Sequence, residues 1–158
     1  RGMVHIEKLT LVSCENINDF EGLGGLKKLT SLSLVSCPNL KNLSSLGKVQ
    51  ELQFLHIDSC VELSDLSALS GLVNVETIIL EFCGKVSDIS GLENMEHLQR
   101  LALSCCRNEV VDLKPLRKLK SLRTLDLSGS IRLTDLTPLR ELERLNSLSV
   151  AGGGARAD

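Results

Sequence analysis

The amino-acid sequence predicts a right-handed α/β solenoid, an arc with short parallel strands on its concave face and 3₁₀ or irregular returns on its convex face. The first observation is a cysteine that recurs every 23 residues in a frame of aliphatic residues, at Cys14, Cys37, Cys60, Cys83 and Cys106. Self-similarity at a period of 20 to 50 residues is typical of stacked structural units. The second observation is that each unit contains two apolar periods, one of two residues and one of three.

The period of two predicts the strands, and the period of three predicts the returns. Leu55-His56-Ile57 and Leu125-Asp126-Leu127 alternate apolar and polar residues, as a half-buried strand does. Residues 66–72 instead place an apolar residue at every third position, which suits a 3₁₀ return. Because no unit can bury its apolar edge alone, we expect the units to stack in register around one leucine core.

Six full units and a partial seventh follow from this alignment, with the starts Ile6, Leu29, Leu52, Val75, Leu98, Leu122 and Leu145. The fifth unit is one residue longer after Cys106, which predicts a local bulge, and Ser130 replaces the cysteine of the sixth. We expect residues 1–150 to form one array, as a fragment of a longer one, and residues 151–158, with three glycines, to form a flexible tail.

The composition narrows the function classes. The 158 residues are 42% hydrophobic and 24% charged, yet they contain no apolar run near the roughly 18 residues that a membrane span needs. The net charge of −2 argues against a general nucleic-acid binder. The chain opens without a secretory signal, and its even cysteine ladder is unlike a disulfide framework, so the expected location is intracellular, cytoplasmic or nuclear.

The repeated segment Leu-x-x-Leu-x-Leu-x-x-Cys-x-x-Leu-x-Asp-Leu resembles the leucine-rich repeat over residues 6–150. Residues 121–128 and 133–139 resemble trypanosome repeat proteins regarded as adenylate cyclase regulators. Internalin-like and phosphatase-regulator-like repeats share the Asp-Leu-x-Pro-Leu piece. The resemblance implies non-enzymatic protein recognition, without a cofactor, by a regulator of another protein in a kinetoplastid. A bacterial internalin-like adhesion module is one alternative, and a structural module that oligomerises through its uncapped ends is another.

The cysteine column allows two interpretations. Closely spaced thiolates can bind metal or oxidise together. The alternative is a structural ladder in which each inward thiol caps backbone groups of the turn, and it is favoured because no histidine shares the column and Ser130 substitutes there. We therefore predict no metal site. Cys105 precedes the ladder position and is expected to be more exposed.

A second polar column follows each cysteine by five residues, or by six in the longer unit. Its members are Asp19, Asn42, Asp65, Asp88, Asp112 and Asp135. Repeated carboxylates can bind calcium, but each is followed by an apolar residue and then by the return. We predict that these side chains accept backbone N–H bonds at the start of the return.

The outward side chains of the strands are the expected binding surface. In the third and fourth units they are large, and the candidate partner-binding residues are Phe54, His56, Asp58, Ile79, Glu81 and Phe82. An apolar centre with an acidic edge is typical of a protein-binding site. His56, Asp58 and Glu81 also permit an acid–base or metal-binding reading, but a nucleophile, a phosphate cradle and a closed pocket are missing from the pattern. No catalytic residue is predicted.

Charge is distributed unevenly along the chain. Residues 51–99 contain nine acids against Lys85 alone, and residues 100–144 contain ten bases against six acids. The basic run, which includes Lys114, Arg117, Lys118, Lys120 and Arg123, is expected on the return side, with nucleic acid as the runner-up partner for that end. Such a dipolar array can steer a partner of opposite pattern. Leu145, Leu148 and Val150 are expected to leave apolar surface exposed at the last unit.

Overall fold

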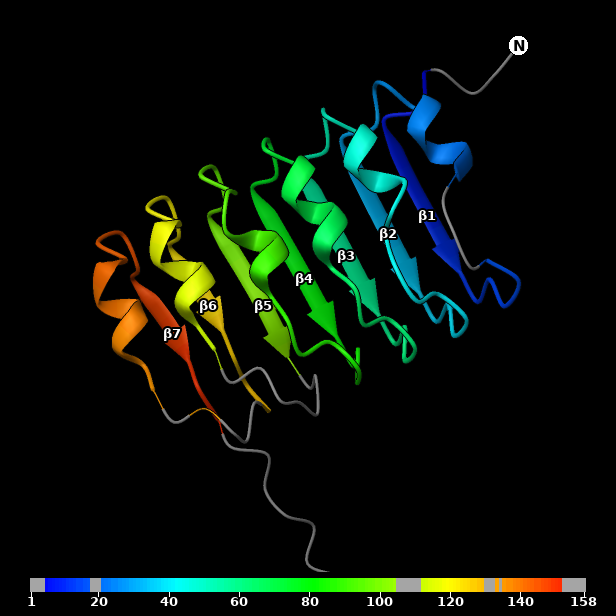
Figure 1. The fold of residues 1–158 in the computed structure, drawn as a ribbon. Coiled ribbons are helices and arrows are strands. Elements are labelled where there is room, and N and C mark those ends of the chain that lie inside the picture. Colours follow the sequence, from blue (N-terminus) through cyan, green and yellow to red (C-terminus); the bar gives the residue numbers. More distant parts are fainter. Residues whose placement is uncertain (1–4, 18–20, 105–111, 130–132, 134, 152–158) are drawn as a thin grey trace, which may run out of the picture.

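A computed structural model describes residues 5–17, 21–104, 112–129, 133 and 135–151. Seven parallel strands form one open sheet in sequence order (Figure 1). They are β1 (Lys8–Val12), β2 (Ser31–Val35), β3 (Phe54–Asp58), β4 (Thr77–Glu81), β5 (Arg100–Ser104), β6 (Thr124–Asp126) and β7 (Ser147–Ser149). The predicted leucine-rich-repeat solenoid, with one short parallel strand in each unit, is confirmed.

A 3₁₀ return joins each strand to the next, as the three-residue apolar period predicts. The returns are η1 (Glu21–Gly25), η2 (Leu46–Lys48), η3 (Ser67–Gly71), η4 (Ser90–Leu92), η5 (Lys114–Lys118) and η6 (Thr137–Glu141). All of them lie on the same side of the sheet and stack in sequence order (Figure 1). The opposite face of the sheet is therefore left uncovered within the described part of the chain.

The aliphatic frame forms the core between the sheet and the returns. All eight apolar positions of the second unit are at most 1% exposed: Leu29, Leu32, Leu34, Cys37, Leu40, Leu43, Leu46 and Val49. Equivalent residues of neighbouring units lie side by side, since β2 pairs with β3 as Leu32↔Leu55 and β3 pairs with β4 as Leu55↔Ile78. The repeat period therefore equals the offset between neighbouring strands.

The sixth and seventh units are less well covered than the central ones. Leu136, Leu148 and Val150 are 44%, 46% and 43% exposed, whereas Leu145 packs against the core. The predicted apolar surface at the last unit is thus confirmed for Leu148 and Val150. None of the helices in the described ranges is long and apolar enough to cross a lipid bilayer.

The cysteine column is a ladder of inward thiols. The Sγ atom of Cys60 lies 3.6 Å from the carbonyl oxygen of Asp58 in its own strand and 4.0 Å from that of Leu34 in the preceding one. Burial raises the pKa of the Cys60 thiol to about 11, so the group stays protonated at neutral pH. The structural reading is confirmed for Cys37, Cys60 and Cys83, which are buried and form no disulfide. Cys105, Cys106 and Ser130 lie outside the described residues.

The acidic column opens the returns, as predicted. In five units the side-chain Oδ1 accepts the N–H two residues further on, at 3.1, 2.8, 2.7, 2.9 and 2.8 Å for Asn42, Asp65, Asp88, Asp112 and Asp135. These are Asx turns, in which a short side chain imitates a backbone turn. The four aspartates lie two residues before the first residue of their 3₁₀ return, as Asp65 does before Ser67. Asn42 lies further away, because η2 starts only at Leu46. Asp19 lies outside the described residues.

We expect Asp65→Ala to lower the free energy of unfolding by about 1 kcal/mol at pH 7, in the range of lost caps. Hydrogen bonding from the side chain and the N–H of Ser67 holds the pKa of Asp65 below its ordinary value. The unfolded chain therefore takes up the proton at a higher pH than the folded one does. The stabilisation is complete above the ordinary carboxyl pKa and is lost as the pH falls through the lower folded pKa.

Urea unfolding of wild type and variant between pH 7 and pH 2 measures this difference. Asp65→Asn is the matched control, because asparagine fills the same position at Asn42 and still offers an oxygen acceptor. We expect it to retain most of the stability at pH 7. A constant difference between wild type and Asp65→Ala across this pH range would contradict a role for the carboxylate.

Candidate partner-binding face

The uncovered face of the sheet, here called the sheet face, consists of the strand side chains that point away from the core. The strand register arranges them in three rows across the array. The first row is Lys8, Ser31, Phe54, Thr77, Arg100, Thr124 and Ser147; the middle row is Thr10, Ser33, His56, Ile79, Ala102, Asp126 and Ser149; the third row is Val12, Val35, Asp58, Glu81 and Ser104. The five candidate residues that lie on strands, Phe54, His56, Asp58, Ile79 and Glu81, all belong to these rows.

One member of the middle row departs from the expected exposure. Ala102 is only 4% exposed, although it points away from the core with the rest of its row. Its methyl group is short, and its row neighbours on the adjacent strands are Ile79 and Asp126. Larger side chains on both sides shield this position from solvent.

The six candidate residues lie together, as the register requires. Phe54, His56 and Asp58 on β3 are neighbours of Thr77, Ile79 and Glu81 on β4. The side chains of this pair of strands that point outward are all half-buried. Phe82 follows β4 directly and is 56% exposed. An aromatic and aliphatic centre therefore borders a pair of carboxylates.

His56 is held between two polar side chains. Its Nδ1 lies 3.1 Å from the Oγ of Ser33 on β2, and its Nε2 lies 3.5 Å from Oε2 of Glu81 on β4. With the Ser33 hydroxyl donating to Nδ1, the neutral ring carries its hydrogen on Nε2 and directs it at the carboxylate. The sequence places Ser33 one repeat period before His56 and thus in the same row, but Ser33 was not among the candidate partner-binding residues.

A serine, a histidine and a carboxylate in contact invite comparison with hydrolase triads. Acyl transfer also needs backbone N–H groups that stabilise an oxyanion. β3 and β4 are interior strands paired on both sides, so their N–H groups are engaged in the sheet. The side chains of His56 and Glu81 are 25% and 39% exposed, on an open face. The arrangement therefore orients an imidazole and a carboxylate without the surroundings that activate a nucleophile.

Phe82 occupies a backbone conformation that bulky residues avoid. Its φ is 52°, in the left-handed region, and the equivalent residues Ser13, Ser36 and Ser59 have φ values of 53°, 54° and 55°. In the sixth unit the position is Gly129, with a φ of 86°. A left-handed conformation is costly for a residue with a Cβ atom. The serines and the glycine before the turn were the available sequence signal for it.

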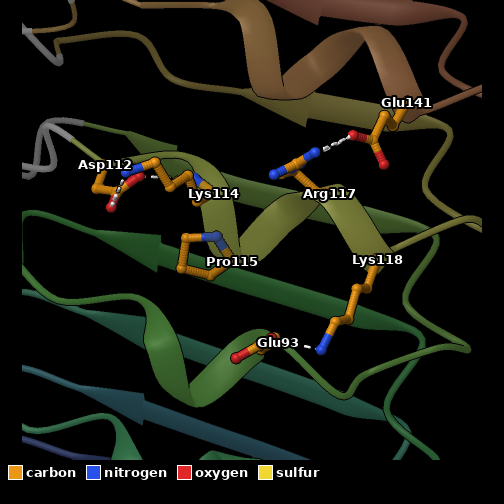
Figure 2. Close-up of a pocket in the computed structure, with 7 residues that line it drawn as sticks. All are labelled: Glu93, Asp112, Lys114, Pro115, Arg117, Lys118 and Glu141. Atoms are coloured by element: carbon orange, nitrogen blue, oxygen red, sulfur yellow. Dashed lines mark hydrogen bonds and ion pairs between the residues drawn. The ribbon is translucent and has the colours of Figure 1, made fainter.

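The return side carries the predicted basic run, and carboxylates neutralise much of it. Arg117 Nε donates to Glu141 Oε1 at 2.8 Å, and Lys118 Nζ donates to Glu93 Oε1 at 2.6 Å. Figure 2 shows these two side chains reaching from η5 toward the following and the preceding return. Together with Asp112, Lys114 and Pro115, these four residues line an open concavity of about 440 Å³. These two ion pairs thus link η5 to the neighbouring repeats.

A metal centre is not formed by the residues described in the structure. No group of three or more histidine, cysteine, aspartate or glutamate side chains among them is placed to hold an ion. The acidic column is spread along the array, with one carboxylate or amide per repeat, each engaged in its own Asx turn. The calcium reading of that column therefore finds no support in the geometry.

Comparison with known proteins agrees with the repeat assignment. Residues 96–141 match the family model described as leucine-rich repeats, two copies. No curated protein sequence matches the chain. The family match assigns leucine-rich repeats to residues 96–141, and the fold repeats the same strand-and-return unit along the described chain.

Solved structures share the fold. An internalin, InlF, from Listeria monocytogenes superposes with a TM-score of 0.69 at 24% identity, over 92% of this chain and 47% of the internalin. Internalin C2 from the same bacterium gives 0.64 at 20% identity, over 85% and 57%. A leucine-rich-repeat protein from Leptospira interrogans gives 0.60 at 22% identity, over 82% and 38%. The chain thus spans about half the length of the two internalins.

Proposed function

We propose that this leucine-rich-repeat array is a non-enzymatic scaffold that recognises a protein partner on its sheet face. The contact residues are Phe54, His56, Asp58, Ile79, Glu81 and Phe82. The observation that carries the proposal is the concentration of large side chains on β3 and β4. The other strands present mainly Ser, Thr, Val and Ala on the same face. Apolar anchors next to charged groups form the centre of many protein interfaces.

The experiment is affinity capture with the double variant Phe54→Ser and Ile79→Ser. Both side chains are outward and half-buried, so their loss removes interface area at small cost to the core. We expect the variant to capture at least tenfold less of a partner protein than the wild type does. Calorimetry with the purified partner should then show at least tenfold weaker binding. The melting temperature of the variant should stay near that of the wild type.

A matched control removes two exposed apolar side chains away from the sheet face. Val61 and Val73 are 48% and 45% exposed in the turns after β3 and η3. The double variant Val61→Ser and Val73→Ser should bind as the wild type does. If both double variants bound as tightly as the wild type, the binding site would not lie on β3 and β4.

For the biological role, we propose that the array regulates another protein inside the cell. The resemblance of residues 121–128 and 133–139 to trypanosome cyclase-regulator repeats supports an intracellular partner such as a cyclase. Cys37, Cys60 and Cys83 are buried and form no disulfide, which suits a reducing compartment. The internalins share the fold at low identity, which leaves an adhesion role as the alternative. Addition of the purified array to a kinetoplastid adenylate cyclase should change its activity, and an unchanged activity would argue against this partner.

Association between copies is a second candidate function. β7 is the last strand of the described sheet, and Leu148 on β7 and Val150 directly after it expose apolar surface. Uncovered apolar ends of repeat arrays favour association. Light scattering at several concentrations tests this candidate. A molar mass of the wild type that rises with concentration, together with a monomeric Leu148→Lys variant, supports it. A wild type that is monomeric at every concentration contradicts it.

A further inference from the structure

We infer that the partner of the sheet face is basic, and that it places an arginine or lysine against Asp58, Glu81 and Phe82 beside an apolar side chain seated on Phe54 and Ile79. This inference rests on the proposed function and names the chemistry of the partner. It follows from a contrast between the two sides of the array in how acidic side chains are compensated.

Away from the sheet face, three glutamates are paired with bases of neighbouring repeats. Glu62 accepts from Lys85 at 2.7 Å, Glu93 accepts from Lys118 at 2.6 Å, and Glu141 accepts from Arg117 and Lys120. Opposite charges about one repeat apart thus meet at these three glutamates. Lys85, the one lysine or arginine of residues 51–99, is engaged in such a pair, with Glu62, in the turns that follow β4 and β3.

On the sheet face, the described structure gives Asp58 and Glu81 no lysine or arginine partner. Oδ1 of Asp58 accepts from the Ser59 hydroxyl at 2.9 Å, and Glu81 meets the imidazole of His56 at 3.5 Å. The bases of the face, Lys8 and Arg100, lie in the first row, four residues away along the strand direction. At the usual rise per residue this is roughly 13 Å, too far for an ion pair.

Asp58 and Glu81 are also direct cross-strand neighbours in the register of β3 and β4. Adjacent parallel strands are about 4.8 Å apart, and like charges placed side by side destabilise a sheet. Phe82, next in the chain, is exposed and left-handed, which also costs stability. Two features that weaken the isolated array thus meet at one point. A cation from a partner relieves the repulsion and can stack on the Phe82 ring.

The rows give the spacing that the partner needs. Ile79 and Glu81 are two residues apart on β4, as are His56 and Asp58 on β3. The middle row, which contains Ile79, and the third row, which contains both carboxylates, are therefore roughly 7 Å apart. An arginine or lysine two residues from a leucine in an extended segment, or three to four residues away on a helix, spans this distance. The charge of the third row selects a basic segment over an acidic one.

The test uses fluorescence anisotropy with three labelled twelve-residue peptides in the same serine background. The first carries three leucines alternating with three arginines, the second has glutamates in place of the arginines, and the third has alanines in place of the leucines. We expect the wild-type chain to bind the first peptide at least tenfold more tightly than the other two. Asp58→Asn combined with Glu81→Gln should reduce this binding at least tenfold, and Asp58→Lys combined with Glu81→Lys should transfer preference to the glutamate peptide.

The control removes two charges from the same acidic segment away from the sheet face. Glu51→Gln combined with Glu96→Gln gives the same net charge as the neutral Asp58 and Glu81 variant, and it should keep wild-type binding. Both Asp58→Asn and Phe82→Gly should raise the melting temperature while weakening binding. If this control variant also lost its preference for the arginine peptide, the preference would come from the long-range attraction of the net charge alone, and the inference would be overturned. Equal binding of all three peptides, or of none, would also overturn it.

The two proposals fail in different ways. A purified partner that is lost from the Phe54 and Ile79 variant but binds the Asp58→Asn, Glu81→Gln variant normally would leave the recognition face in place and overturn the basic partner. A partner that binds both variants normally would overturn both proposals.

Discussion

Gly91→Ala should destabilise the array by about 3 kcal/mol or more, and the neighbouring Gly84→Ala should leave its stability within about 0.5 kcal/mol of the wild type. Gly91 lies in η4 and is buried. A Cβ atom at this position would lie 2.2 Å from the carbonyl oxygen of Leu66, 2.8 Å from the carbonyl carbon of Leu66 and 3.2 Å from the Cα of Ser67. All three are backbone atoms of the preceding repeat, so no side-chain rotation removes the overlap.

The close approach follows from the stacking of the returns. Gly71 in η3 lies against Gly47 in η2, where an added Cβ would meet the Gly47 carbonyl oxygen at 3.0 Å. The contact at Gly91 is tighter, so an alanine there must push η3 and η4 apart and open the leucine core between them. Overpacking that forces side chains off their rotamers and shifts the backbone costs roughly 1 to 3 kcal/mol, occasionally more. The upper end applies here because only backbone atoms oppose the added Cβ.

Urea denaturation monitored by circular dichroism measures both variants. Gly84 is the matched control because an added Cβ there meets nothing within 4 Å. We expect a lower urea midpoint for Gly91→Ala with an unchanged one for Gly84→Ala. Equal midpoints for the two variants would show that the returns separate without cost and that the packing of η4 on η3 is loose.

Most of the fold could be predicted from the sequence because one period governs both chain and structure. A 23-residue repeat places Leu32, Leu55 and Ile78 at equivalent points, and the sheet pairs them as neighbours. Once the strand is known, its alternation decides which side chains face outward. The rows of the sheet face, including Phe54, His56 and Asp58, follow without further information.

The interactions that vary between repeats could not be read from the period. The left-handed turn at Phe82 depends on backbone geometry, and serine at the equivalent positions is common in many other settings. The ion pairs of Arg117 and Lys118 depend on the reach of long side chains between returns. Opposite charges 23 to 25 residues apart were a signal for these pairs, but the same spacing also occurs between residues that do not meet.

Leu55→Ala should cost 2 to 5 kcal/mol, about the cost of truncating a fully buried leucine, whereas Leu148→Ala should cost well under half as much. Both residues belong to the same column of the sheet, which runs Leu9, Leu32, Leu55, Ile78, Leu101, Leu125 and Leu148. Leu55 is 0% exposed between Leu32 and Ile78, and Leu148 on β7 is 46% exposed. The same substitution on the same column therefore differs mainly in burial.

The different costs of Leu55→Ala and Leu148→Ala follow from the way in which stability is distributed along a repeat array. Each unit contacts only its neighbours, so a central leucine stabilises two interfaces and a leucine of the last unit stabilises one. Leu9 on β1 packs against the core while only partly buried, and Leu9→Ala should fall between the other two. Chemical denaturation of the three variants gives the order directly. Equal costs at all three positions would mean that β7 is covered in solution, as end-to-end association through Leu148 and Val150 would require.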